Sequence, residues 1–145
     1  MSDTVVRSAR RDDAEALAEL STQLGYPSDA ESMRQRLDAA LSSPEHMIYV
    51  CCIDSELAAW IHVMRTVHLE SGFGVEIAGL IVSQRRRGQG LGTQLVRDAM
   101  SWAKSQGFER LRVRSRAERV GAHAFYQGLG FEQEKLQHVF ACPLP

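Results

Sequence analysis

Cysteine and proline are scarce in this chain of 145 residues, and long apolar runs are absent. The three cysteines, Cys51, Cys52 and Cys142, show no C-x-x-C spacing, so the sequence predicts neither a metal site nor a disulfide framework. No run approaches the ~20 apolar residues that span a membrane. The polar first residues also lack the apolar stretch of a secretory signal. We therefore expect a cytoplasmic protein that has no contact with a membrane.

Linkers, internal repeats and low-complexity tracts are also missing from the sequence. The four prolines fall in connections or in the last three residues, where they do not separate one half of the chain from the other. A chain of this length can bury roughly two thirds of its surface without disulfides or metals. We expect one domain that covers residues 1–145.

Lysine is nearly absent, and the arginines are unevenly distributed. Residues 1–83 carry a net charge of −7, residues 84–119 carry +7, and residues 120–145 carry −1. A basic central segment favours a polyanionic partner, most commonly a phosphate, although a solvated arginine-rich face has the same composition. Nucleic acid fits less well, because the whole chain is not basic and the segment has few aromatic residues for base stacking.

Apolar periodicity predicts a mixed sheet covered by helices. Gly25 is expected to end the first helix, and Ser28 with Glu31 resembles a capping box that opens the second. Gly72 and Gly74 are expected to break the chain before an apolar strand buried on both faces. The expected strands cover residues 4–9, 47–53, 57–65, 75–82, 110–115, 131–133 and 136–141, and the expected helices cover residues 12–24, 28–43, 90–106 and 122–129.

The most informative stretch lies between the apolar strand at 75–82 and the helix at 90–106. Its loop holds Gly88, Gly90 and Gly92 together with three consecutive arginines, Arg85 to Arg87. Glycines and a helix N-terminus let backbone N–H groups converge on an anion, so the loop predicts a diphosphate site. A tight structural turn has the same glycines. The loop lacks the Gly-Lys pair of a Walker A sequence and the third glycine and acidic residue of a dinucleotide fingerprint.

Two motifs resemble the GNAT superfamily of N-acetyltransferases. The segment Arg87-Gly88-Gln89-Gly90-Leu91-Gly92 is similar to the Q/R-x-x-G-x-G/A acetyl-CoA signature of that family. About thirty residues later, the segment from Ala122 to Phe131 resembles its A-x-x-F-Y-x-x-L-G-F block. The resemblance covers essentially the whole chain. It implies an α/β (mixed α+β) fold, with a central, mostly antiparallel mixed sheet flanked by about four helices.

The resemblance also implies a site for acetyl-CoA as co-substrate. Backbone amides of the signature loop would hold the pyrophosphate, and the strand before the loop would pair with the pantetheine arm. Arg85, Arg86 and the strand at 110–116 are alternative partners for the 3′-phosphate. The residues expected to bind the cofactor are Leu80, Ile81, Val82, Arg87, Gly88, Gln89, Gly90, Leu91, Gly92, Thr93, Ala122 and Phe125.

Acetyl transfer to an amine needs a base for the amine and benefits from an acid for the leaving thiolate. Tyr126 matches the family tyrosine near the thioester sulfur and is the candidate acid. Glu76 is the candidate base, because a carboxylate in an apolar strand is costly without a role or partner, and family members carry a glutamate at this place. An exposed position at the start of the strand is the alternative for Glu76.

Five other residues are secondary candidates for the chemistry or for contact with the cofactor. Glu70 and Glu118 are weaker candidates for the base. His123 lies one helical turn before Tyr126 and either tunes it or is a surface residue. His62 faces either the protein interior or a substrate cleft. Arg119 replaces the asparagine that many family members carry, which puts the usual side-chain contact with the cofactor in doubt.

The sequence therefore predicts an enzyme that moves the acetyl group of acetyl-CoA to a primary amine by direct attack in a ternary complex. A non-catalytic acyl-CoA-binding module of the same fold is the alternative, and a nucleic-acid binder is a third. The acidic residues 1–83 weakly favour a cationic small-molecule or peptide amine as acceptor. The family often forms dimers, so a homodimer is compatible with the resemblance.

Overall fold

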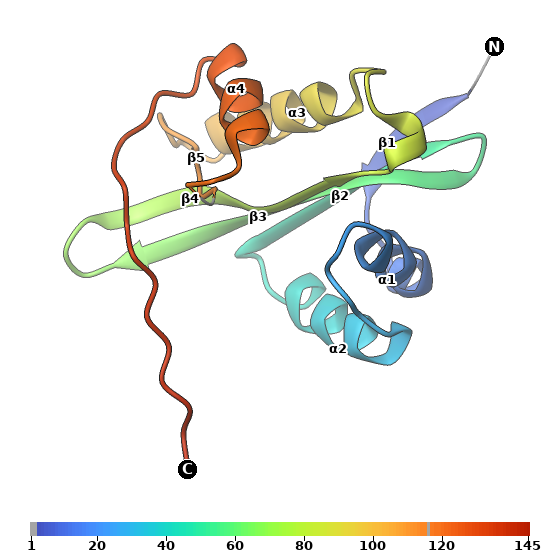
Figure 1. Ribbon diagram of the computed structural model, residues 1–145, viewed down its shortest axis with the longest axis horizontal. Helices are drawn as coiled ribbons and strands as arrows, with labels where there is room; N and C mark the ends of the chain where they lie inside the picture. Colours follow the sequence, from blue (N-terminus) through green and yellow to red (C-terminus); the bar gives the residue numbers. More distant parts are fainter. Residues whose placement is uncertain (1–2, 116) are drawn as a thin grey trace. The chain divides into compact units, whose positions relative to one another are not determined.

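A computed structural model describes residues 3–115 and 117–145 of the chain (Figure 1). These residues form two compact units, one up to Arg114 and one from Ser115 onward, and each is described by itself. No helix in the described ranges is both long enough and apolar enough to span a bilayer.

The first unit is built on one five-stranded sheet with the strand order β1-β2-β3-β4-β5. Neighbouring strands are antiparallel from β1 to β4, and β5 pairs with β4 in parallel. This architecture confirms the expected mixed, mostly antiparallel sheet. The strands are β1 (Thr4–Ser8), β2 (His46–Ile53), β3 (Glu56–His68), β4 (Gly72–Val82) and β5 (Arg112–Val113).

Helices cover both faces of this sheet. The helices α1 (Ala14–Gln23) and α2 (Ala30–Leu41) lie on one face, and α3 (Leu91–Ser105) lies on the other (Figure 1). One apolar cluster contains Leu17 of α1, Leu37 of α2 and Val50 of β2, with Trp60 of β3 packed against it. The apolar stripe of α3, which includes Leu95, Val96 and Ala99, is fully buried. Burial of these faces fixes which side chains each strand presents to which helix layer.

The ends of α1 and α2 show how local sequence sets the helix boundaries. Gly25 follows α1 in the left-handed conformation, with φ of +88°, as its expected stop position requires. The capping residue of α2 is Asp29 rather than Ser28, because the Asp29 carboxylate accepts a hydrogen bond from the Ser32 N–H at 2.7 Å. The expected capping box is therefore wrong by one residue.

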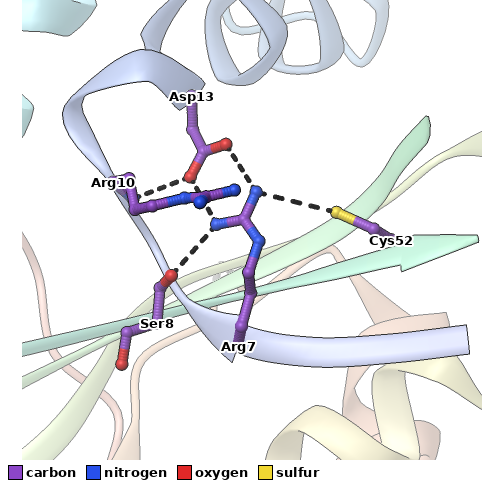
Figure 2. A network of polar contacts seen from close by, with 5 residues as sticks. All are labelled: Arg7, Ser8, Arg10, Asp13 and Cys52. Atoms are coloured by element: carbon purple, nitrogen blue, oxygen red, sulfur yellow. Dashed lines mark hydrogen bonds and ion pairs between the residues drawn. The ribbon is translucent and has the colours of Figure 1, made fainter. Parts of the chain in front are cut away.

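A partly buried ion pair joins β1 to the 3-10 turn η1 (Arg11–Asp13) (Figure 2). Both terminal nitrogens of Arg7 donate to the Asp13 carboxylate at 2.8 Å, and the Arg10 backbone N–H donates to it at 2.7 Å. Arg7 also donates to the Ser8 carbonyl and lies 4.0 Å from the Cys52 sulfur. These contacts tie the edge strand to the start of α1.

Two expectations about β4 are corrected. Gly72 and Gly74 do not break the chain, since both belong to β4, where Gly74 pairs with Thr66 of β3. The run at 75–82 is not buried on both faces: Val75, Ile77 and Ile81 are buried, whereas Ala78 is exposed. An irregularity in the β3–β4 register between His62 and Val63 leaves Ala78 without a partner in β3.

The expected strand at 110–115 is reduced to the two residues of β5, because only Glu76 and Ile77 of β4 offer partners. The described residues of the second unit form one helix, α4 (Val120–Gly128). The strands expected at 131–133 and 136–141 do not form, and those residues have no regular secondary structure. Alternating side chains favour a strand only when a neighbouring strand supplies backbone partners, and the periodicity of a single sequence does not show whether one is there.

Candidate active site

The glycine loop joins β4 to α3 through the 3-10 turn η2 (Gln84–Arg86). Ser83 is buried, and its N–H donates to the Ala58 carbonyl of β3 at 2.8 Å, which anchors the start of the loop to the sheet. Gly88 and Gly90 have φ of +78° and +82°, in the left-handed region that favours glycine. Gly90 is the capping residue of α3. The glycines are therefore required by the backbone path between the sheet and the helix.

This path leaves a row of backbone donors at the start of α3. The earliest hydrogen bond along the helix runs from the Gln94 N–H to the Gly90 carbonyl at 3.0 Å. The N–H groups of Leu91, Gly92 and Thr93 precede that bond, at the positions that have no partner within a helix. Leu91 is buried and fixes the first turn against the sheet. The arrangement suits an anion, because orphan N–H groups and the helix dipole act at the same place.

The three arginines of the loop differ in their surroundings. Arg85 forms an ion pair with Glu56 of β3, and both side chains are largely exposed. Arg86 is half-buried and Arg87 is exposed. An exposed pair of this kind contributes little stability, so a bound phosphate can compete for Arg85.

The edge of β4 beside the loop is the second notable feature. In the part of the chain that the structure describes, β5 pairs with β4 only at Glu76–Arg112 and Ile77–Val113. Beyond Ile77, β4 continues through Leu80, Ile81 and Val82 with β3 as its partner on the other side. The backbone groups on the β5 side of these residues have no strand partner in the sheet. An unpaired strand edge accepts an added extended chain.

Glu76 lies where the pairing between β4 and β5 ends. It is the fifth residue of β4, so the alternative of an exposed glutamate at the strand start is wrong. Its Oε2 accepts from Arg114 Nε at 2.9 Å, and the Glu76 side chain is 16% exposed. Arg112 is its register partner on β5. The carboxylate is therefore half-buried and compensated by an arginine.

Two histidines lie on the same sheet face as Glu76. His62 of β3 and His46 of β2 are half-buried, and His46 Nδ1 is 2.8 Å from His62 Nε2. The pKa of His62 is lowered by burial and, to a lesser degree, by the neighbouring His46. Sequence reasoning singled out His62 but missed His46, because their contact depends on the register that places Ile48 opposite His62.

In the second unit, Tyr126 lies on α4 among aromatic neighbours. Its ring is in edge contact with Phe125 at 5.0 Å and with Phe131 at 5.4 Å. Burial raises the pKa of Tyr126, and the charge of Arg119 partly offsets that rise. The phenol therefore stays protonated near neutral pH. Ala122 and His123 are half-buried on the same helix, and Arg119 is its capping residue.

Other features of the molecule lie away from these groups. A shallow depression is lined by the end of α3 and the following turn, with Met100, Lys104, Phe108 and Leu111 among its residues. Since α3 has 15 residues, this depression is roughly 20 Å from the glycine loop. Within residues 3–115 and 117–145, no three or more His, Cys, Asp or Glu side chains gather in a group able to hold a metal ion.

Comparison with known proteins gives a consistent picture. Residues 13–131 match the model of the "Acetyltransferase (GNAT) family". An uncharacterised N-acetyltransferase of Bacillus subtilis (strain 168), YhdJ, is 29% identical over 119 residues, which are 81% of each chain. The sequence motifs and the comparisons thus indicate the same family.

Solved structures share the fold. The aminoglycoside N-acetyltransferase AAC(6')-Iy in complex with CoA aligns with a TM-score of 0.88 at 16% identity, covering 99% of this chain and 97% of that one. The aminoglycoside 6'-N-acetyltransferase AAC(6')-IG from Acinetobacter haemolyticus aligns with a TM-score of 0.84 at 20% identity, covering 97% and 99%. Together with the family match, these findings confirm the expected fold and enzyme class. The chain belongs to the acetyltransferase (GNAT) family, whose members are acetyl-CoA-dependent N-acetyltransferases.

Proposed function

We propose that this protein transfers the acetyl group of acetyl-CoA to a primary amine by direct attack in a ternary complex. The observation that carries the proposal is the continuity of the unpaired β4 edge, from Ala78 to Val82, with the glycine loop and the N-terminus of α3. A ligand with an extended arm and a diphosphate group would fit along the strand edge and onto the loop. Acetyl-CoA has both groups.

In this proposal each part of the cofactor meets a distinct set of groups. Backbone groups of Leu80, Ile81 and Val82 pair with the pantetheine arm, and the loop residues 87–93 hold the pyrophosphate through their N–H groups. Arg86 and Arg87 add positive charge there, as does Arg85 once it leaves Glu56. Ala122 and Phe125 of α4 are proposed to contact the same cofactor.

The chemistry then needs two proton transfers. Glu76 is proposed to accept the proton of the attacking amine, whose positive charge can take the place of Arg114 at the carboxylate. Tyr126 is proposed to donate a proton to the departing thiolate, for which its raised pKa keeps it in the protonated form. The N–H bond of the amine breaks as the new C–N bond forms, and the C–S bond of the thioester breaks as the thiol forms.

The acceptor is proposed to be a small-molecule or peptide amine, and the protein is proposed to act in the cytoplasm without nucleic acid or membrane. Aminoglycoside acetyltransferases share the fold, and the acidic residues 1–83 favour a cationic amine over an anionic one. A homodimer is compatible with the family. A non-catalytic acyl-CoA-binding module is the alternative, and Glu76 with Tyr126 argues against it.

Calorimetric titration tests the cofactor site first. Acetyl-CoA is expected to bind with a micromolar Kd, and ATP is expected not to bind at the same concentrations. The matched variants are Gly90→Ala, which strains a left-handed backbone position, and Gly121→Ala, whose added methyl group meets open space. Loss of affinity in the first variant alone supports the loop assignment. A folded wild-type protein that binds no acetyl-CoA would overturn it.

A panel of amines with a thiol-release readout then tests the transfer. Amine-dependent thiol release at the same rate as acetylated product formation is the expected result. Tight binding of acetyl-CoA with no release for any amine in the panel would favour the binding-module alternative.

A further inference from the structure

The paired histidines His46 and His62 are the strongest feature that the proposed reaction leaves unused. The two rings belong to adjacent strands, with the nitrogens His46 Nδ1 and His62 Nε2 2.8 Å apart and the ring centroids 5.0 Å apart. A nitrogen–nitrogen distance this short is a hydrogen bond, so one ring donates and the other accepts. The outer nitrogens, His62 Nδ1 and His46 Nε2, remain as the two ends of a two-ring chain.

The sheet register places this pair beside Glu76. His46 of β2, Met64 of β3, Glu76 of β4 and Arg112 of β5 are consecutive register partners across four strands. His62 precedes Met64 by two residues and so shares its face. Glu76 is the register partner of Met64, so it lies on this face across β3–β4 from His62, with the irregularity at Ala78 between Gly79 and Ile77. A direct contact or one bridging water is the link that the relay requires.

The surroundings of His62 differ on its two sides along β3. Trp60, two residues earlier on the same face, packs against the apolar cluster beneath α1 and α2, and so do Ile48 of β2 and Met33 of α2. Toward the C-terminal end of β3, the same face carries the charged groups Glu76, Arg112 and Arg114.

A second ion pair lies next to His46 in the sequence, because Glu45 pairs with Arg65. The histidine pair therefore stands at the border between the apolar cluster and the charged row.

Acetyl transfer from a thioester to an ammonium group releases one proton per turnover to solvent. The ammonium loses two protons, and the thiolate takes up one of them. Glu76 must also return to its anionic form before the next amine arrives, so a half-buried carboxylate needs an exit for its proton. No such exit is provided by Arg114, which is always protonated.

We propose that His62 and His46 form a relay that carries this proton from Glu76 to solvent. The proposal rests on the acetyl transfer proposed above. The O–H bond of protonated Glu76 breaks as a bond forms to His62 Nδ1, either directly or across one water. His62 Nε2 then gives up its own proton to His46 Nδ1, and His46 Nε2 releases a proton to water. Each ring then holds the same number of protons on the opposite nitrogen. Proton exchange with water at His46 Nε2 and His62 Nδ1, with return of the shared proton to His62 Nε2, restores the starting tautomers before the next turnover.

The neutral state of His62 suits this task. Burial and His46 lower the pKa of His62, so its ring is uncharged near pH 7 and holds a transferred proton only briefly. Two imidazolium rings at this distance would repel each other and lose their hydrogen bond, so the pair carries no more than one extra proton at a time. The order of transfer requires hydrogen on His62 Nε2 and a free lone pair on His62 Nδ1.

Kinetics of the glutamine variants His62→Gln and His46→Gln test the relay. Glutamine keeps a side-chain hydrogen bond within reach but does not pass protons through a ring. We expect kcat to fall about tenfold or more, the KM for acetyl-CoA to stay unchanged, and added imidazole buffer to restore part of the rate. His68→Gln is the matched control, on an exposed position of the same strand, and should behave like the wild type in all three respects.

A nitrogen NMR measurement on the wild-type protein tests the proposal without any substituted histidine. Long-range ¹⁵N–¹H correlation spectra report which nitrogen of each ring carries hydrogen. The relay requires hydrogen on His62 Nε2 and none on His62 Nδ1 near pH 7. The opposite tautomer would overturn the relay whether or not the enzyme acetylates an amine, because no lone pair would then be left to accept.

The kinetic outcomes separate the two proposals. If both glutamine variants keep the kcat of the wild type and do not respond to imidazole, the relay alone is overturned. The proposed acetyl transfer then stays in place. A reduced kcat that imidazole does not restore would assign the pair a structural role and would also overturn the relay. A wild-type protein that acetylates no amine would overturn the proposed function and the relay together.

Discussion

The ion pair between Arg7 and Asp13 illustrates how single residues fix local structure. Asp13 is 8% exposed and is held by Arg7 and by the Arg10 N–H, and hydrogen bonding to Arg7 lowers its pKa (Figure 2). A carboxyl group whose pKa is lower in the folded state adds stability above its unfolded pKa of about 3.9. That stability is lost as the pH falls through the folded pKa.

We expect Asp13→Asn to lower the free energy of unfolding at pH 7 by about 1.5–3 kcal/mol, because the half-buried Arg7 is left without its anion. The variant should also lose less stability than the wild type between pH 5 and about pH 2. Urea unfolding at several pH values measures both effects. Asp12→Asn removes the same charge from an exposed neighbour and is the control. If the free energies of unfolding of wild type and Asp13→Asn change in parallel with pH, the role given to this ion pair is contradicted.

Glu76 is the residue whose proposed role has the clearest kinetic test. We expect Glu76→Gln to reduce kcat by about 100-fold or more and to remove the acidic limb of the pH–rate profile, because no carboxylate remains to accept the proton. Glu109→Gln, at an exposed position after α3, serves as the matched control. An acidic limb that persists unchanged in Glu76→Gln would remove the base assignment.

Tyr126 is tested by deletion of one oxygen. Tyr126→Phe keeps the edge contacts with Phe125 and Phe131 but removes the phenolic proton. We expect kcat to decrease by a factor between several-fold and a few hundred-fold, with nearly unchanged affinity for acetyl-CoA. Tyr49→Phe on β2 is the control, and steady-state kinetics with a calorimetric Kd provide the comparison. Undiminished turnover would show that another group or water protonates the thiolate.

At the scale of elements, β4 depends on a close approach between Gly79 and Trp60. A Cβ atom at Gly79 would lie 2.9 Å from two ring carbons of Trp60, whose ring packs against the core cluster. We expect Gly79→Ala to cost about 1–3 kcal/mol in the free energy of unfolding, because the half-buried ring is held against the core cluster and has little room to move. Trp60→Leu in the same background should recover part of that loss. Urea unfolding of the two single variants and the double variant measures this coupling. If the changes in unfolding free energy simply add, the steric explanation is contradicted.

The elements also show what a single sequence can predict. The helix at α3 and the hairpin of β2 and β3 were expected within a few residues, because their apolar periodicity is strong and their ends carry glycine or turn residues. The length of β5 and the missing strands after α4 were not, because strand formation depends on partners elsewhere in the chain. The glycine loop was predictable from adjacent residues. The contact between His46 and His62 was not, because these residues are 16 positions apart in the sequence and meet only through the register of β2 and β3.

At the scale of the whole molecule, charge is segregated along the chain. The basic segment at 84–119 contains the loop, η2 and α3, whereas the acidic first 83 residues form most of the sheet and the helices on its other face. Positive charge in the segment that holds the proposed pyrophosphate loop and negative charge in the preceding residues suit the proposed anionic cofactor and cationic acceptor. The proposed cofactor residues nevertheless come from both compact units, since Ala122 and Phe125 lie beyond Arg114.

Hydrogen–deuterium exchange tests that assignment for both units at once. If the cofactor residues are correctly assigned, saturating acetyl-CoA slows exchange at residues 80–93 and also at residues 120–128, while β1 and β2 are unaffected. The N–H groups at the start of α3 should show the largest decrease in exchange rate. They have no partner within the helix, and the bound cofactor would accept their hydrogen bonds. ATP at the same concentration is the control. Protection limited to residues 80–93 would remove Ala122 and Phe125 from the cofactor site, because a bound cofactor that touches α4 must restrict its opening.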